Sequence, residues 1–265
     1  MFAKSEGHDV KSPIHVAGLP IVDASVEASV AQLVSDARNR TPRVYVFVNA
    51  YSATLRRQEP AYALLLDDPR VLPLADGAPL AYGALLTGQG RVARAPGPDV
   101  FEAACEELAS GELGIALVGG MPGTAQRLAE KLKQRFRGLR IRLAITPPVG
   151  EWSPTETQEL VAAVNESGAD VIWLGVSAPR QETWAVANIE AIGRPVLCVG
   201  AAFDFLSGQK PRAPRWMRLI GLEWLFRLAS EPARLWRRYL VGNAVFLSDL
   251  ARYRSKRIID RPDKA

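Results

Sequence analysis

Residues 115–123 read Ile-Ala-Leu-Val-Gly-Gly-Met-Pro-Gly, a short apolar run that ends in a glycine-rich turn and enters a helix-forming segment. The same rhythm recurs between residues 43 and 200, where further apolar runs lie at 44–48, 71–74, 141–145, 171–174 and 196–199. Several runs are apolar at consecutive positions, as expected for strands covered on both faces. The intervening segments are long enough for right-handed helical crossovers. The sequence therefore predicts an α/β fold with a doubly wound, mainly parallel Rossmann-like sheet.

Helix signals fill the intervals between the predicted strands. Ser153-Pro154-Thr155-Glu156 is a capping box with proline at the first helical position, and Gly168 is suited to end that helix. Ahead of the sheet, residues 16–21 predict a small hairpin or edge element, and a helix follows over about residues 25–38.

The last quarter of the chain differs in charge from the rest. Residues 210–265 hold 14 Lys and Arg against 5 Asp and Glu, whereas the first 209 residues hold 19 against 23. Gly208, Pro211 and Pro214 interrupt the periodicity where the balance changes sign. We predict an α/β domain over residues 1–208 and a basic helical appendage over residues 209–265. Basic residues interleaved with Trp and Tyr suit an anionic membrane surface, nucleic acid, or the chain's own acidic domain.

Composition limits the cellular setting. A chain of 265 residues with 48% hydrophobic content can bury a substantial core. Cys105 and Cys198 stand far apart in apolar runs, which is typical of reduced, packed thiols and favours the cytosol. Residues 1–12 are polar without a signal-peptide core, and no apolar run reaches the ~20 residues that span a bilayer. Any membrane contact is expected to be peripheral.

Ligands of an open parallel sheet bind beyond the carboxyl ends of its strands. The residues at these positions are polar or glycine-rich, namely Asn49, Asp76-Gly77, Gly119–Gly123, Pro179–Glu182 and Gly200–Asp204. The Gly119–Gly123 turn could hold a phosphate on free helix amides, or could serve only as a tight strand-to-helix turn. The dinucleotide pattern of three glycines in six positions is absent.

Asp76 is the only acid at the tip of the second predicted strand. This setting is compatible with a general base, whose carboxylate accepts a proton from an attacking hydroxyl. The alternative is an N-cap for a helix over residues 78–86, and the two roles can coexist. Arg94 lies in a loop with two prolines, where it could neutralise a diphosphate or simply cover the surface.

Several catalytic motifs are missing from the sequence, including a P-loop, an Asp-x-Asp metal–diphosphate motif, a Gly-x-Ser-x-Gly elbow and a His-containing triad. Arginines and helix dipoles would then stabilise a departing nucleotide diphosphate without a divalent ion. A dinucleotide-dependent oxidoreductase is a second hypothesis, but residues 135–145 offer no acid to hold the ribose. A third is a non-catalytic membrane or nucleic-acid binding module built on the basic tail.

Short motifs follow one another in a specific order and spacing. They are Ala75-Asp76-Gly77, Arg94 with Gly97-x-Asp99, and the motifs within residues 118–123, 178–182, 200–208, 212–216 and 221–239. Through these motifs the chain resembles, from about Val16 to Tyr239, the WecB/TagA/CpsF glycosyltransferases, also called glycosyltransferase family 26.

The resemblance implies a metal-independent, inverting transfer of a sugar from a UDP-sugar to a saccharide on a polyprenyl diphosphate carrier. This reaction would occur at the cytoplasmic membrane face, without a cofactor. Similar members add N-acetylmannosamine, N-acetylmannosaminuronic acid or glucose during teichoic acid, enterobacterial antigen or exopolysaccharide assembly. The expected partners are the UDP-sugar, the lipid-linked acceptor and an anionic membrane surface, without nucleic acid; homo-oligomers are compatible with the resemblance.

The resemblance also suggests roles for single residues. It implies a base at Asp76, a substrate contact at Asn49, a diphosphate contact at Arg94 and a further site residue at Gln181. For the nucleotide we expect contacts at Gly119, Gly120, Gly123, Pro179, Glu182 and Asp204. Contacts to the lipid diphosphate or the membrane are expected among Arg215, Arg218, Arg227, Arg234, Arg238, Trp216 and Trp224. No metal ligand is expected.

The chain departs from the family pattern at two positions. The family usually has Thr two residues before the Asn, where this chain has Phe47, so a hydroxyl near the donor sugar or the acceptor is missing. The family's Gly-Ala-Pro is Ser177-Ala178-Pro179 here, which adds a hydroxyl near the expected nucleotide. The first departure bears on the identity of the donor sugar.

Overall fold

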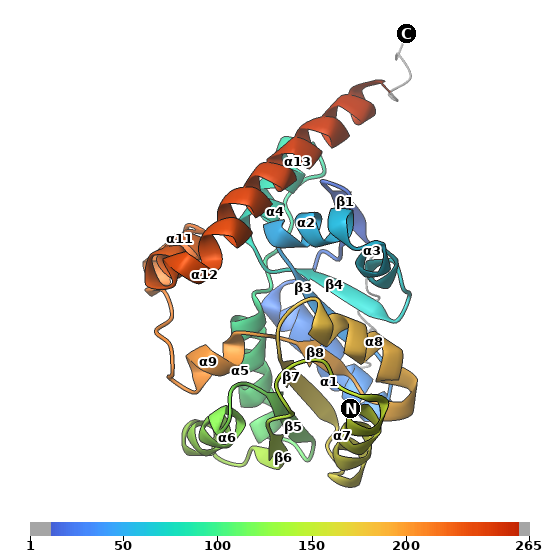
Figure 1. Cartoon of the computed structure of the whole chain (residues 1–265), viewed down its shortest axis with the longest axis vertical. Helices are drawn as coiled ribbons and strands as arrows, with labels where there is room; N and C mark the ends of the chain where they lie inside the picture. The colour runs from blue at the N-terminus through green and yellow to red at the C-terminus, as the bar shows by residue number, and fades with distance from the viewer. Residues whose placement is uncertain (1–11, 260–265) are drawn as a thin grey trace, which may run out of the picture.

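The computed structural model describes residues 12–259; residues 1–11, which include most of the polar N-terminal segment, and residues 260–265 lie outside the described part. A six-stranded parallel sheet occupies the centre of the molecule (Figure 1). Its strands run in the spatial order β4 (Val71–Ala75), β3 (Val44–Val48), β8 (Val196–Cys198), β7 (Val171–Gly175), β5 (Gly114–Gly119) and β6 (Arg140–Ile145). All six strands predicted from the apolar runs are confirmed, and all neighbouring pairs are parallel.

The N-terminal elements also follow the sequence prediction. Strands β1 (Ile14–Val16) and β2 (Leu19–Ile21) form a two-stranded antiparallel hairpin. Helix α1 (Val26–Asn39) follows, and the Ser25 hydroxyl accepts a hydrogen bond from the Ala28 N–H at 3.2 Å. The capping box at Ser153 and Glu156 opens α7 (Pro154–Glu166) as expected.

Helices cover both faces of the sheet, which confirms the doubly wound architecture (Figure 1). One face carries α1, α5 (Gly97–Ala109), α6 (Thr124–Arg135) and α9 (Ala202–Leu206). The other carries α2 (Ala50–Gln58), α3 (Pro60–Leu66), α7 and α8 (Arg180–Ile192). Successive residues of a strand enter opposite cores: Trp173 stacks on Phe101 of α5 with ring centroids 3.9 Å apart, while Ile172 and Leu174 belong to the other core.

The turn after β5 depends on glycine. Gly119 has a φ of +135°, and a Cβ added to it would lie 2.6 Å from the carbonyl carbon of Gly175 at the end of β7. The Gly120 N–H donates to the Gly175 carbonyl at 2.9 Å. The ends of β5 and β7 therefore approach each other so closely that only glycine fits at position 119.

The basic C-terminal segment forms consecutive helices that fold back on the α/β domain (Figure 1). They are α10 (Arg215–Leu219), α11 (Glu223–Ser230), α12 (Pro232–Trp236), the π-helical turn η1 (Arg237–Val241) and α13 (Gly242–Ile259). Helix α13 packs along α2, and its Phe246 and Leu250 are buried in the same core as Val16 of β1. We keep the name appendage for residues 209–259, although its core is continuous with that of the domain.

No helix within residues 12–259 has both the length and the apolar character required to cross a bilayer.

Candidate active site

A pocket of about 420 Å³ lies where the carboxyl ends of the strands meet the appendage. Its lining includes the residues directly after β3, β4 and β8, which are Asn49, Asp76 and Val199. Arg227 of α11 and Arg238 of η1 line it from the appendage. The volume is within the range of ~300–1,000 Å³ typical of small-molecule sites. The position is the one at which an open parallel sheet binds its ligands.

Asp76 lies in this pocket and does not cap the following helix. The N-cap of α4 (Ala78–Leu86) is Gly77, and no side chain caps that helix. Burial raises the pKa of the Asp76 carboxyl to about 6, and the nearby Glu223 adds to the increase, while Arg227, Arg94 and the backbone of Gly97 oppose it. The carboxylate is therefore a stronger base than an exposed aspartate, yet it remains ionised at pH 8.

Three arginines give the pocket a cationic wall around Asp76. Arg94 comes from the loop before α5, and Arg227 and Arg238 come from the appendage. Arg227 lies over the Phe205 ring at 5.3 Å, and Arg238 lies over the Tyr51 ring at 4.8 Å. The Nε atoms of Arg94 and Arg227 are buried and make no hydrogen bond to the described protein groups. Buried donors of this kind suit an anionic ligand.

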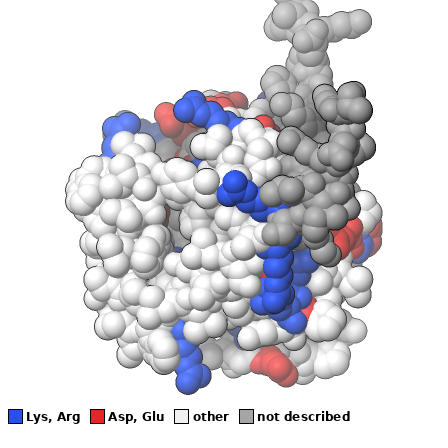
Figure 2. All heavy atoms as spheres, turned by 90° about the horizontal axis from the view of Figure 1, so that it is seen from above, with Lys and Arg blue, Asp and Glu red and all other residues white. Residues whose placement is uncertain are grey.

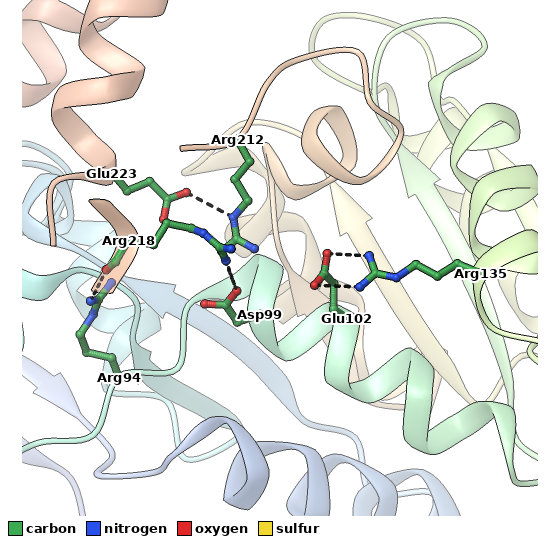
Figure 3. A network of polar contacts seen from close by, with 7 residues as sticks. All are labelled: Arg94, Asp99, Glu102, Arg135, Arg212, Arg218 and Glu223. Atoms are coloured by element: carbon green, nitrogen blue, oxygen red, sulfur yellow. Dashed lines mark hydrogen bonds and ion pairs between the residues drawn. The ribbon is translucent and has the colours of Figure 1, made fainter. Parts of the chain in front are cut away.

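A network of ion pairs fastens the appendage beside this wall (Figure 3). Asp99 of α5 pairs with Arg212 at 2.7 Å and with Arg218 at 3.1 Å. Arg94 donates from Nη1 to the carbonyl oxygen of Arg218 at 3.1 Å, and Arg212 also lies 3.5 Å from Glu223. The predicted Arg218 thus joins the appendage to the domain and does not line the pocket.

The predicted residues Asn49 and Gln181 line the pocket and also hold its shape. The Asn49 side chain accepts a hydrogen bond from the Tyr51 N–H at 3.0 Å and caps α2. Gln181 is buried; its amide nitrogen donates to the Cys198 carbonyl at 3.1 Å, and its amide oxygen accepts from the Gly200 N–H at 3.1 Å. These bonds fix the turn after β8.

Glu182 is a buried carboxyl beside Gln181. It accepts a hydrogen bond of 2.7 Å from Gln181, while its Oε2 atom has no partner among the described protein groups. Burial raises the pKa of Glu182 to about 7, against the opposing effect of that hydrogen bond and of the more distant Arg238. Glu182 therefore changes its protonation near neutral pH within the pocket lining.

The other residues expected to bind the nucleotide divide into two groups. Gly120 and Asp204 line the pocket, and Asp204 is paired with Lys210 at 3.0 Å. Gly119, Gly123 and Pro179 do not line it. Gly119 serves the close approach of β5 and β7, whereas Gly123 has a φ of +80° and is the N-cap of α6.

The remaining residues predicted for the appendage also divide by position. Trp224 lines the pocket and its ring lies 6.0 Å from that of Tyr239. Arg234 lines the pocket as well and pairs with Glu231 at 2.7 Å. Arg215 and Trp216 of α10 are exposed, and 60% of the Trp216 surface is accessible. Arg215 and Trp216, together with the exposed Arg234, are therefore the predicted appendage residues that can meet a surface outside the pocket.

Glu223, Tyr239 and Arg180 also line the pocket; the sequence placed Arg180 at a strand end but assigned no role to it, nor to Glu223 or Tyr239. Arg180 lies over the Trp152 ring at 5.0 Å and has a buried Nε without a hydrogen-bond partner in the described chain. Tyr239 and Arg238 share the π-helical turn η1, and such turns are frequent at functional sites. The signals for Glu223 and Arg180 were their neighbours in the motifs, Trp224 and Gln181.

Within the described residues, no group of three or more His, Cys, Asp or Glu side chains is arranged to hold a metal ion.

A protein-family model for the glycosyl transferase WecG/TagA/CpsF family matches residues 14–259 of this chain. The match covers both the α/β domain and the appendage helices that line the pocket.

Proposed function

Since this chain belongs to the glycosyl transferase WecG/TagA/CpsF family, and is therefore a glycosyltransferase of cell-surface polysaccharide synthesis, we propose that it uses a UDP-sugar and a polyprenyl-diphosphate-linked acceptor. The observation that carries this proposal is the position of Asp76, a carboxylate of raised pKa inside a pocket walled by Arg94, Arg227 and Arg238. A base and a cluster of cations within one pocket meet the two electrostatic demands of glycosyl transfer from a nucleotide diphosphate.

The proposed reaction is a single inverting displacement. An acceptor hydroxyl oxygen attacks the anomeric carbon, the bond from that carbon to the diphosphate oxygen breaks, and UDP departs with the bonding electrons. Asp76 takes the hydroxyl proton as the new glycosidic bond forms. Its raised pKa strengthens the proton acceptor in the transition state, when the hydroxyl has become acidic.

We propose that arginines stabilise the departing diphosphate without a divalent metal ion. Arg227 and Arg238 approach from the appendage and Arg94 from the domain, so positive charge surrounds the pocket from two sides. A guanidinium group carries a positive charge across the physiological pH range. Charge-assisted hydrogen bonds from such groups to phosphate oxygens are among the strongest in proteins.

Phe47 lines the pocket at the position where the family that the chain resembles usually has a threonine. Its ring lies against Gly97, where an added Cβ would come within 3.3 Å of the ring. An apolar ring thus replaces the hydroxyl that relatives usually present at this position. We propose that Phe47 selects the donor by shape and not by a hydrogen bond.

A mass-resolved transfer assay tests the proposed function. The full chain is incubated with separate UDP-sugars and a short-chain polyprenyl diphosphate glycan, with EDTA in a parallel series. We expect one UDP-sugar to extend the acceptor by one sugar, with an unchanged rate in EDTA. A chain that transfers no sugar from any UDP donor, or that stops in EDTA, contradicts the corresponding part of the proposal.

We further propose that the exposed apolar face of the appendage rests on an anionic membrane. Trp216, Leu219 and Ile220 of the α10 segment are 60%, 70% and 52% exposed. Seen from the end toward which α13 projects, the surface is largely uncharged, with Lys and Arg side chains among it and Asp and Glu side chains mainly toward its margins (Figure 2). Large apolar side chains beside basic ones suit the boundary between headgroups and acyl chains.

The triple variant Trp216→Ser, Leu219→Ser, Ile220→Ser is expected to bind anionic vesicles ~10-fold more weakly or worse, because full burial of even one such apolar side chain contributes ~1.5–3 kcal/mol and each 1.4 kcal/mol changes affinity about tenfold. Co-sedimentation measures the bound fraction. Leu64→Ser, a change at a 74% exposed leucine of α3, is the control. Truncation near Lys210 is a poorer test, since it would remove Phe246 and Leu250 from the core. Equal loss in the control, or none in the triple variant, would place the membrane contact elsewhere.

A further inference from the structure

Glu223 is an acid that the appendage places in the pocket of Asp76. It is the first residue of α11, its side chain is 20% exposed, and it lines the pocket together with Asp76. Its Oε1 atom lies 3.5 Å from Arg212 Nε (Figure 3). Arg212 has a closer partner in Asp99, at 2.7 Å, so holding Arg212 in place does not require Glu223.

The appendage supplies most of the charges that act on Asp76. Arg227 and Glu223 come from α11, and Arg238, which interacts electrostatically with Asp76, comes from η1. The domain itself contributes Arg94 and the backbone of Gly97. Asp76 thus meets cations from both sides, and Glu223 is the anion among the described groups that opposes them.

These charges serve two demands that conflict. Cations close to the pocket stabilise a departing diphosphate, but the same cations stabilise the ionised form of Asp76 and weaken it as a base. A second carboxylate near Asp76 has the opposite effect on the base. Glu223 at the start of α11 and Arg227, about one helical turn further on, bring these two opposing effects to the pocket on the same helix.

We infer that Glu223 is a positioning residue for the proposed transfer, which offsets the arginines of the appendage and so keeps Asp76 basic enough to accept the acceptor proton. This inference rests on the proposed function. Docking of the appendage then brings the cations for the leaving group into the pocket and, through Glu223, also keeps Asp76 a strong enough base. An alternative role for Glu223, as an acid that merely favours the α11 N-terminus, predicts no change at Asp76.

The test compares three variants in the full chain. Glu223→Gln removes the anion, Glu223→Asp keeps it, and Asp249→Asn breaks an appendage–domain ion pair with Arg57 that does not act on Asp76. The readouts are the acid limb of the kcat/KM profile and the titration of the ¹³C-labelled Asp76 carboxyl, assigned with Asp76→Asn. We expect Glu223→Gln to move both to lower pH by ~0.5 pH unit or more, and to slow transfer at pH 8 about two-fold.

Glu223→Asp is expected to titrate close to the wild-type chain, and Asp249→Asn to leave both curves unmoved. Arg227→Gln removes a cation and should move the Asp76 carboxyl titration in the opposite direction, to higher pH, which keeps the test decisive if Glu223→Gln does not fold. The inference is overturned if Glu223→Gln lowers activity with no shift in either curve, or if Arg227→Gln shifts the titration downward. A chain without transferase activity would refute the proposed function, whereas the carboxyl titration would still decide the role of Glu223.

Discussion

Asp76→Asn is expected to lower the rate of sugar transfer by ~10²-fold or more while the chain keeps its fold and its affinity for UDP. The amide is close in shape to the carboxyl and cannot accept the acceptor proton. Because the variant leaves Arg94, Arg227 and Arg238 in place, we expect the cationic side of the pocket to keep its affinity for the diphosphate. Single-turnover transfer separates this loss of chemistry from UDP binding, which calorimetry measures.

The pH dependence of the wild-type chain gives the same prediction a second readout. Burial raises the folded-state pKa of Asp76 to about 6, so kcat/KM should fall as the pH drops through about 6. Because the folded-state pKa lies above the unfolded value of 3.8, the folded state loses stability as the pH rises from 3.8 through about 6, and the full penalty is present above that pH. Asp76→Asn should therefore have an equal or higher Tm than the wild type at pH 8, with no advantage below pH ~3.8, where both folded and unfolded carboxyls are protonated.

Asp67→Asn is a matched control, since this half-exposed acid pairs with Arg56 at 3.6 Å on the surface. Its transfer rate should equal that of the wild type. Wild-type turnover by Asp76→Asn would eliminate Asp76 as the base and would turn attention to Glu182, the other pocket carboxyl with a raised pKa.

Most strands of this fold are readable from sequence because they are buried on both faces of the sheet, whereas the edge strand β6 is only partly buried. Runs such as residues 44–48 and 171–174 are apolar throughout, and each run coincides with a strand. The family resemblance is likewise confirmed by the match over residues 14–259. These features could be predicted from sequence because a buried strand appears as a run of consecutive apolar residues, and the family motifs appear as short stretches in a fixed order.

The site was only partly readable. Asp76, Asn49 and Gln181 stand at strand ends, which a parallel sheet brings together, and all three line the pocket. The division of the appendage arginines is set by tertiary packing: Arg218 meets Asp99 of α5, whereas Arg227 and Arg238 enter the pocket. The sequence of a basic segment does not show which arginine will form an ion pair between two elements and which will line a pocket.

Two neighbouring arginines of η1 show how sharply packing separates such roles. Arg238 is partly buried, lies over Tyr51 and lines the pocket. Arg237 is exposed, lies over Trp236 at 5.3 Å and does not line it. Both carry one positive charge and both extend over an aromatic ring. The pair therefore offers a comparison in which charge and local sequence are held constant and only access to the pocket changes.

Arg238→Ala is expected to lower kcat by ~10²-fold, because loss of one preorganised donor to a developing oxyanion costs about that much. Arg237→Ala should retain at least half of the wild-type rate with a short-chain acceptor in solution, where membrane attachment plays no part. UDP binding should weaken in the first variant and not in the second. Thermal denaturation of both shows whether loss of the Tyr51 contact unfolds the chain. Arg238→Lys keeps the charge but lacks the planar, five-donor group, so only partial activity should return. Equal losses in Arg237→Ala and Arg238→Ala would mean that the appendage acts through its net charge alone, and the pocket would then need another cation for the leaving diphosphate.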